Sequence, residues 1–275
     1  MPEKLIPEIR EGQSVALLQA LHILTRDSKL NQDSRRKLKQ VYHLYNFIEP
    51  LLEDVLALRE NFTLADHGAG KSYLGFILYD LFLKSKANGH IYGIETRQEL
   101  VEKSRELADK LGFERMEFLN LTVEASIESN ALPPQIDIVT ALHACNTATD
   151  DAIKFALAKN ARHIVLVPCC QAEVAAVLRK HKNESFGKTP LSEIWRHPLH
   201  TREFGSHLTN VLRCLLLESH GYQVTVTELV GWEHSMKNEL IIATHTGAPR
   251  GNARQRLEQI LVELNLEELR PRFVY

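Results

Sequence analysis

A short stretch near residue 65 has the residue types and spacing of a ligand-binding turn. A β-prone run ends at Leu64, and Gly68 and Gly70 follow closely. Glycine gives the backbone freedom and allows a close approach that a side chain would block. Apolar residues then repeat at helical spacing, at Leu74, Ile77, Leu78 and Leu81. We therefore predict a strand, a turn and a helix, with a ligand over the turn near the helix N-terminus.

Two classes of ligand use such a turn. Residues 65–72 have the spacing of a phosphate-binding loop ending in Gly70-Lys71-Ser72, with Ala65 where the strict pattern has glycine. Asp66-x-Gly68-x-Gly70 is instead the acidic glycine turn of S-adenosylmethionine-dependent methyltransferases. A carboxylate would repel a di- or triphosphate, but it suits the cationic amino-acid and sulfonium parts of S-adenosylmethionine. The turn favours S-adenosylmethionine, and the phosphate-binding loop is the alternative.

Two polar residues at the ends of predicted strands fit a nucleoside ligand. Glu95 closes a predicted strand 25 residues after Gly70, close to the spacing at which a carboxylate receives ribose hydroxyls. Asn120 ends the next predicted strand, where its amide could pair with the edge of adenine. The alternatives are an exposed glutamate at a strand end and an asparagine that serves a turn.

The residues after the fourth predicted strand contain a candidate base, His143. In this architecture that position lies beside the transferred methyl group, and the unperturbed histidine pKa near neutrality suits a proton acceptor. A histidine held by hydrogen bonds within the loop is the alternative. Methyl transfer depends mainly on aligning the nucleophile, the methyl carbon and the sulfur, so a base is not obligatory.

One group of residues resembles a zinc ligand set, namely His143, Cys145, Cys169 and Cys170. Adjacent residues of an extended chain point in opposite directions, so Cys169 and Cys170 could not both face one metal without a bend. Buried thiols are the favoured interpretation, and we expect no structural metal.

The order of predicted elements indicates an α/β fold. Predicted strands at 90–95, 116–120, 136–142 and 161–167 alternate with helices at 97–111 and 150–158, which is typical of a doubly wound parallel sheet. Strands at 222–230 and 238–244 are so close in sequence that they must form a hairpin, with one strand antiparallel. We predict a Rossmann-like class I methyltransferase fold with a seven-stranded, mostly parallel sheet.

The chain divides into three predicted parts. Residues 1–60 form an N-terminal helical extension, 61–247 a cofactor-binding methyltransferase domain with a helical insertion at 175–220, and 248–275 a C-terminal helix. Pro50 is expected to kink or divide the helix predicted at 41–55.

Composition excludes some classes of protein. The 275 residues contain 33 Lys and Arg against 35 Asp and Glu, a net charge of −2, so no global basic field indicates nucleic acid, although a local patch can suffice. The charged first ten residues lack the apolar core of a secretion signal, and no apolar run approaches membrane-spanning length. We expect a cytoplasmic protein. Its four cysteines are too few and too scattered for a disulfide framework.

Five ordered motifs carry a family resemblance. They begin at Asp66, Leu142, Val167, Glu203 and Lys237 and read DHGAGKSYL, LHACNTATD, VPCC, EFGSHLTNVLR and KNELIIA. They resemble a family of bacterial class I methyltransferases. That family's methyltransferase domain also resembles parts of predicted eukaryotic RNA methyltransferases, including the 2′-O-methyltransferase of the tRNA acceptor stem. The resemblance covers about residues 33–245 and implies S-adenosylmethionine binding at Asp66, Gly68, Gly70 and Glu95.

The methyl acceptor is expected to be RNA. The predicted helical insertion interleaves cations and aromatic side chains, which can meet phosphate and stack on a base; these are Trp195, Arg196, His197, His200, Arg202, Phe204 and His207. We predict that Arg202 and Phe204 contact the acceptor. The alternatives are a protein or small-molecule acceptor, an inactive cofactor-binding module, and a helical cover whose aromatics pack inward. A phosphate-loop nucleotidase would need a magnesium-binding aspartate at the end of a later strand, which residues 140–142 and 166–168 lack.

Overall fold

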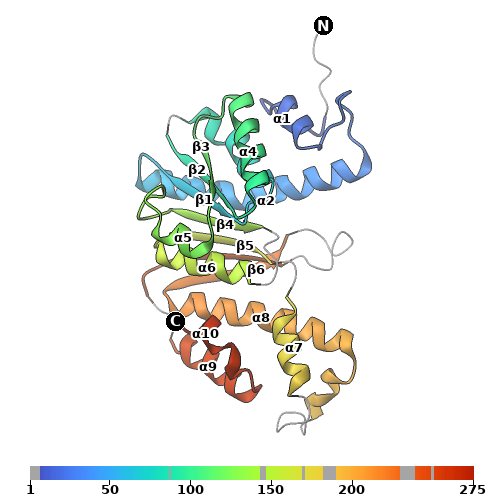
Figure 1. Cartoon of the computed structure of the whole chain (residues 1–275), viewed down its shortest axis with the longest axis vertical. Coiled ribbons are helices and arrows are strands. Elements are labelled where there is room, and N and C mark those ends of the chain that lie inside the picture. The colour runs from blue at the N-terminus through green and yellow to red at the C-terminus, as the bar shows by residue number, and fades with distance from the viewer. Residues whose placement is uncertain are drawn as a thin grey trace.

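A single mixed sheet forms the centre of the protein (Figure 1). The computed structural model describes residues 7–86, 88–142, 147–168, 171–181, 190–229, 239–248 and 251–275. The strands are β1 (Thr63–His67), β2 (His90–Glu95), β3 (Met116–Asn120), β4 (Ile138–Leu142), β5 (His163–Val167), β6 (Tyr222–Glu228) and β7 (Glu239–His245). Within the described residues, these seven strands pair in the order β3-β2-β1-β4-β5-β7-β6.

The strand directions confirm the predicted fold. Strands β1 to β5 pair in parallel, whereas β7 is antiparallel to both β5 and β6. This is a mostly parallel sheet that ends in an antiparallel hairpin. In such a sheet the carboxyl ends of β1, β2, β3, β4 and β5 meet at one edge, which is where ligands bind in open α/β sheets.

Helices cover both faces of the sheet (Figure 1). The α-helices are α1 (Val15–Ala20), α2 (Gln32–Leu58), α3 (Tyr73–Leu81), α4 (Gln98–Leu111), α5 (Val123–Glu128), α6 (Ala148–Ala158), α7 (Glu173–Lys180), α8 (Pro198–Ser219), α9 (Ala253–Glu263) and α10 (Arg270–Phe273). Short 3-10 helices are η1 (Leu83–Ser85), η3 (Pro190–Trp195) and η4 (Glu267–Leu269). In the described part of the chain, no helix has the length and apolar composition needed to cross a membrane.

Two apolar cores lie on the two faces of the sheet, because successive strand residues point to opposite faces. Leu64 of β1 belongs to the core that contains side chains of α1, α2, α3 and α4, and the next residue, Ala65, belongs to the core that contains side chains of α6, α7, α8 and α9. The central strands are therefore apolar on both faces, as expected for parallel strands covered by helices.

Helix α2 is not divided at Pro50, contrary to one of the two outcomes expected for that residue. The proline lacks an N–H and removes one helical hydrogen bond, but it lies on the exposed side of the helix. Ile48, Leu52 and Val55 are buried in the core and hold the helix on both sides of the interruption. At its start, the Asn31 side chain accepts a 2.8 Å hydrogen bond from the Ser34 amide and caps the helix.

Helix α8 reaches past the ligand-binding edge of the sheet. It has 22 residues and is therefore about 33 Å long, whereas the seven residues of β6 span about 23 Å. The chain turns from α8 into β6 at Gly221, whose φ is 85°. Because β6 runs in the same direction as β5, the first turns of α8 extend beyond the carboxyl ends of the strands.

Candidate cofactor-binding site

The turn after β1 is folded back onto the end of β2. The Gly68 and Ala69 amides donate hydrogen bonds of 2.9 and 3.1 Å to the Ile94 carbonyl. The Gly70 amide donates a 2.8 Å hydrogen bond to Glu95 Oε2. Gly68 and Gly70 have φ angles of 67° and 58°, a region that favours glycine. These two glycines therefore allow the chain to reverse against β2.

Asp66 is a buried carboxylate beneath the turn. It is 3% exposed, and its Oδ1 accepts a 2.8 Å hydrogen bond from the Thr140 hydroxyl of β4. Burial raises the pKa of Asp66 to about 6, an effect that the Thr140 and Ser72 hydroxyls partly offset and that the Glu95 charge increases. Asp66 can therefore change its charge close to neutral pH.

Glu95 is a second buried carboxylate, and it is strongly ionised. Its Oε1 accepts hydrogen bonds from the Arg97 amide at 3.0 Å and from Arg97 Nε at 3.1 Å, and its Oε2 accepts the Gly70 bond. Burial alone would raise the pKa of Glu95, but these donors favour the charged form and lower the pKa to about 2. The site therefore holds a fixed negative charge at the end of β2.

Asn120 lies at the end of β3, as predicted, and joins that strand to β2. Its Nδ2 donates hydrogen bonds of 3.0 and 2.8 Å to the carbonyls of Glu95 and Thr96. The structure thus brings Asp66, the glycine turn, Glu95 and Asn120 to one edge of the sheet. Both hydrogen bonds that the Asn120 Nδ2 group can donate are therefore made within the protein. The side-chain carbonyl oxygen of Asn120 has no hydrogen bond with any described residue.

One buried polar side chain at the turn lacks hydrogen-bond partners among the described residues. Both ring nitrogens of His67, which is 6% exposed, are unpaired. Burial lowers the pKa of His67 to about 4, so the ring is neutral at pH 7. Unpaired buried polar atoms are costly, and at ligand sites they are commonly satisfied when the ligand binds.

The position of Ser72 disfavours the phosphate-binding loop. In that loop the hydroxyl of the serine binds a magnesium ion. Here Ser72 is 0% exposed and begins α3 with a left-handed φ of 50°, beside the buried Asp66 carboxylate. Its hydroxyl therefore faces the protein interior and is not presented to a nucleotide over the turn.

Sequence reasoning missed three neighbours of these residues, namely Thr140, Arg97 and His67. Thr140 pairs directly with Asp66 across β1 and β4, so a correct strand register would have identified it. Arg97 is two residues after Glu95 in the sequence and its guanidinium is largely exposed. A charged residue so close to a predicted strand end was the available signal.

The structure describes the two residues that were predicted to contact the methyl acceptor. Arg202 and Phe204 lie on the first turns of α8, away from the glycine turn. Arg202 forms an ion pair of 2.9 Å with Glu203, and Phe204 is half-buried against the core.

The candidate base and the candidate zinc ligands, His143, Cys145, Cys169 and Cys170, lie outside the described residues. Among the described residues, no cluster of three or more His, Cys, Asp or Glu side chains could hold a metal ion.

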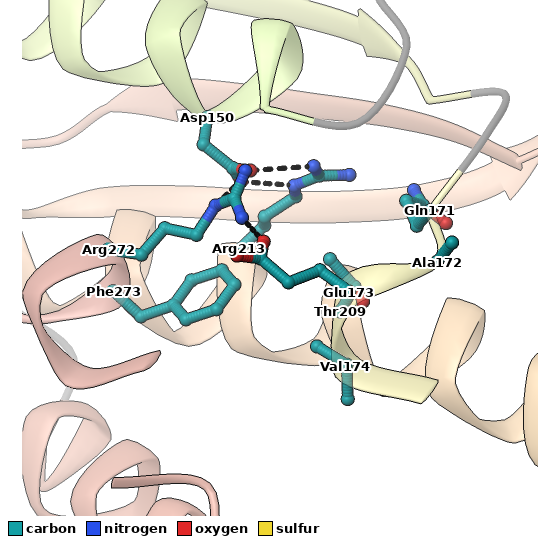
Figure 2. A pocket seen from close by; sticks show the side chains of 9 residues that line it. All are labelled: Asp150, Gln171, Ala172, Glu173, Val174, Thr209, Arg213, Arg272 and Phe273. Carbon is teal, nitrogen blue, oxygen red and sulfur yellow. Dashed lines mark hydrogen bonds and ion pairs between the residues drawn. The ribbon is translucent and has the colours of Figure 1, made fainter. Parts of the chain in front are cut away.

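A buried ionic cluster joins helices α6, α7, α8 and α10 (Figure 2). Arg213 of α8 is 0% exposed and donates bonds of 2.6 and 3.0 Å to the two carboxylate oxygens of Asp150, in the first turn of α6. Arg272 of α10 also binds Asp150 at 2.7 Å and pairs with Glu173 of α7. The cluster therefore ties four helices together.

A family comparison identifies the chemistry of the chain. A family model described as a methyltransferase domain matches residues 36–177, which is more than half of the chain and includes the glycine turn and Glu95. No protein with a curated function matches the chain in sequence.

Solved structures of similar fold are distant in sequence. Magnesium protoporphyrin IX methyltransferase from Synechocystis, with bound S-adenosylhomocysteine, has a TM-score of 0.48 and 13% identity, covering 83% of this chain and 94% of that one. An rRNA methylase from Streptococcus thermophilus has a TM-score of 0.42 and 10% identity, covering 67% and 87%. Precorrin-6y C5,15-methyltransferase from Geobacter metallireducens has a TM-score of 0.41 and 17% identity, covering 68% and 81%.

Proposed function

The chain belongs to the methyltransferase-domain family and is an S-adenosylmethionine-dependent methyltransferase, and we propose that the polar residues at the carboxyl ends of its first three strands bind the cofactor. These residues are Asp66, Gly68, Gly70, Glu95 and Asn120. When bound, S-adenosylmethionine supplies an electrophilic methyl group on a sulfonium sulfur.

The observation that carries this proposal is the carboxylate of Glu95, which is buried, ionised and held against the glycine turn. An ionised carboxylate at the end of the second strand can accept hydrogen bonds from both ribose hydroxyls. The Arg97 side chain that now covers Glu95 is 60% exposed and can rotate into solvent, which leaves the two backbone donors in place.

Asp66 and His67, the last two residues of β1, also support S-adenosylmethionine as the ligand. When ionised, Asp66 favours the cationic amino-acid portion of the cofactor and disfavours a polyphosphate. The neutral, unpaired His67 ring provides one donor and one acceptor at the end of β1. The residues present therefore fit a zwitterionic nucleoside better than a nucleotide.

Calorimetry tests the cofactor. We expect micromolar binding of S-adenosylmethionine and of S-adenosylhomocysteine, without any dependence on magnesium. Glu117, a half-exposed glutamate on the neighbouring β3, provides a control through Glu117→Gln, which should bind like the wild type. Tight binding of magnesium-ATP with no binding of S-adenosylmethionine would contradict the proposal.

We further propose RNA as the acceptor, with Arg202 and Phe204 contacting it and His143 as the candidate proton acceptor. The support is the position of Arg202, which is 57% exposed on the part of α8 that reaches past the ligand-binding edge. Arg202 can exchange its exposed ion pair with Glu203 for a phosphate at little cost, because such pairs contribute little free energy.

Labelled S-adenosylmethionine distinguishes the classes of acceptor. Label should enter total RNA and not a protein extract that has been freed of RNA. Replacing Arg202 and Phe204 together should lower this turnover and leave cofactor affinity nearly intact. Label in protein alone would contradict RNA, and loss of cofactor binding in the double variant would place both residues in the core.

A further inference from the structure

Glu239, the first residue of β7, lies at the ligand-binding edge of the sheet. Strand β7 is antiparallel to β5 with Ile241 opposite Leu166, and Val167 of β5 is opposite Leu142 of β4. Continuing this register places Glu239 just beyond Val167, at the carboxyl ends of β4 and β5. The side chain of Glu239 therefore belongs to the same edge as the glycine turn.

One carboxylate oxygen of Glu239 is bonded to a neighbouring side chain, and the other has no bonding partner among the described residues. Its Oε2 accepts a 2.7 Å hydrogen bond from Asn210 Nδ2 and lies 3.8 Å from His207 Nδ1. Its Oε1 has no hydrogen bond or ion pair with any described residue. The side chain is 24% exposed, so it is not sealed within the core.

Buried groups fix the direction of that carboxylate. Asn210 is 3% exposed, and its Oδ1 accepts a 3.1 Å hydrogen bond from Arg213 Nη1. With its oxygen accepting from Arg213, the Asn210 amide directs its Nδ2 toward Glu239. Arg213 is in turn fixed by two bonds to Asp150 (Figure 2).

This series of contacts supplies orientation more than stability. A buried ion pair such as Arg213 with Asp150 gives little net free energy of folding, because desolvation offsets the attraction. It does hold the neighbouring polar groups in one arrangement, which is what a binding group needs from the residues behind it. Besides joining helices, the fully buried Arg213 thereby holds Asn210, which in turn contacts the Glu239 carboxylate.

We propose that Glu239 Oε1 accepts a hydrogen bond from the N–H or O–H group of the methyl acceptor, with Asn210 and Arg213 as positioning residues. The inference rests on the proposed function, because it places the acceptor at the same edge as the cofactor. Strand β7 is two strand spacings, about 10 Å, from β4, beside which the methyl group is expected.

The test uses the full chain, labelled S-adenosylmethionine and a cell extract that contains RNA and protein as the acceptor. Glu239→Gln keeps an oxygen for the Asn210 bond and removes the charge. We expect a fall of roughly 10- to 100-fold in the rate of transfer, the scale of losing a charged hydrogen-bond partner. Affinity for S-adenosylhomocysteine, measured by calorimetry, should stay within about twofold.

Two further variants separate positioning from folding. Asn210→Ala should slow transfer in the same direction, and the double variant with Glu239→Gln should be no slower than Glu239→Gln alone, because both act through one carboxylate. Glu218→Gln, on α8, removes a similarly enclosed carboxylate that pairs with Arg256, and should leave transfer unchanged.

Each remaining outcome opposes the inference. Unchanged transfer by Glu239→Gln, or multiplicative losses in the double variant, would exclude Glu239 as the acceptor-binding group. Loss of S-adenosylhomocysteine binding in Glu239→Gln would place Glu239 in the cofactor site or the core. If the wild type binds no S-adenosylhomocysteine and transfers no label, the proposed function itself fails and the inference with it, which the calorimetry of the wild type reveals directly.

Discussion

The Gly70 amide donates a 2.8 Å hydrogen bond to Glu95 Oε2 and so joins the turn after β1 to the end of β2. One carboxylate thus fixes the backbone of the glycine turn and presents a negative charge at the same edge. Binding of a nucleoside at Glu95 and the conformation of the turn are therefore coupled.

Glu95→Ala should weaken S-adenosylmethionine binding by roughly 1 to 3 kcal/mol, the scale of removing a charged hydrogen-bond partner. The variant also leaves the Gly70 amide without its acceptor, so the turn becomes less ordered. Calorimetry of the wild type and the variant gives the difference directly. Equal affinities for the two proteins would remove Glu95 from the cofactor site.

Asp66→Asn should change the pH dependence of stability. Because burial raises the pKa of Asp66 to about 6 from 3.8, ionising it costs the folded protein free energy that the unfolded chain does not lose. This cost is absent below pH 3.8 and complete above pH 6, where it reaches at most about 3 kcal/mol. Urea unfolding should show the variant gaining stability over the wild type between pH 4 and pH 8. A difference independent of pH would contradict the shifted pKa.

Gly75→Ala should destabilise the protein by about 1 to 3 kcal/mol, as overpacking does. A Cβ at Gly75 would lie 2.6 Å from the buried Ser72 hydroxyl oxygen. Ser72→Gly removes that oxygen and also relieves the left-handed φ of 50°. The double variant should therefore recover most of the stability lost in Gly75→Ala. Additive effects of the two substitutions in urea unfolding would show that the contact is not the cause.

Arg213→Met should cost about 3 to 5 kcal/mol of unfolding free energy, because it leaves the buried Asp150 carboxylate with fewer donors. Adding Asp150→Asn removes the carboxylate charge that Arg213 had paired, which leaves only Arg272, among the described residues, bound to residue 150, so the double variant should be less destabilised than the sum of the single variants. Urea unfolding of all four proteins completes the cycle. Exact additivity would mean that the two residues do not interact in the folded protein.

The sequence predicts the sheet well because strand and helix periods are local signals. The apolar runs around Leu64 and Ile138 and the closely spaced strand patterns at 222–230 and 238–244 are all readable without tertiary contacts, and the structure confirms the fold they predict. The same logic places Asp66 and Glu95 at one edge, since the carboxyl ends of parallel strands meet there. Their role in binding the cofactor stays a prediction.

Long-range pairs were not readable in this way. Asp150 and Arg213 are far apart in sequence, and nothing in either local pattern indicates a buried ion pair. The division of the helix that was one of the two outcomes expected at Pro50 does not occur, for a similar reason, because buried neighbours from the core outweigh a local helix-breaking preference. The helix α5, only six residues long, gives too short a pattern for periodicity to detect.

The place of β7 in the sheet has a consequence during translation. Strand β7 fills the position beside β5, yet α8 and β6 separate the two strands along the chain. A growing polypeptide therefore exposes the apolar edge of β5 until residues 239–245 have emerged from the ribosome. Unpaired edges promote aggregation. The nascent chain should accordingly depend on chaperones most strongly in the interval between the synthesis of β5 and that of β7.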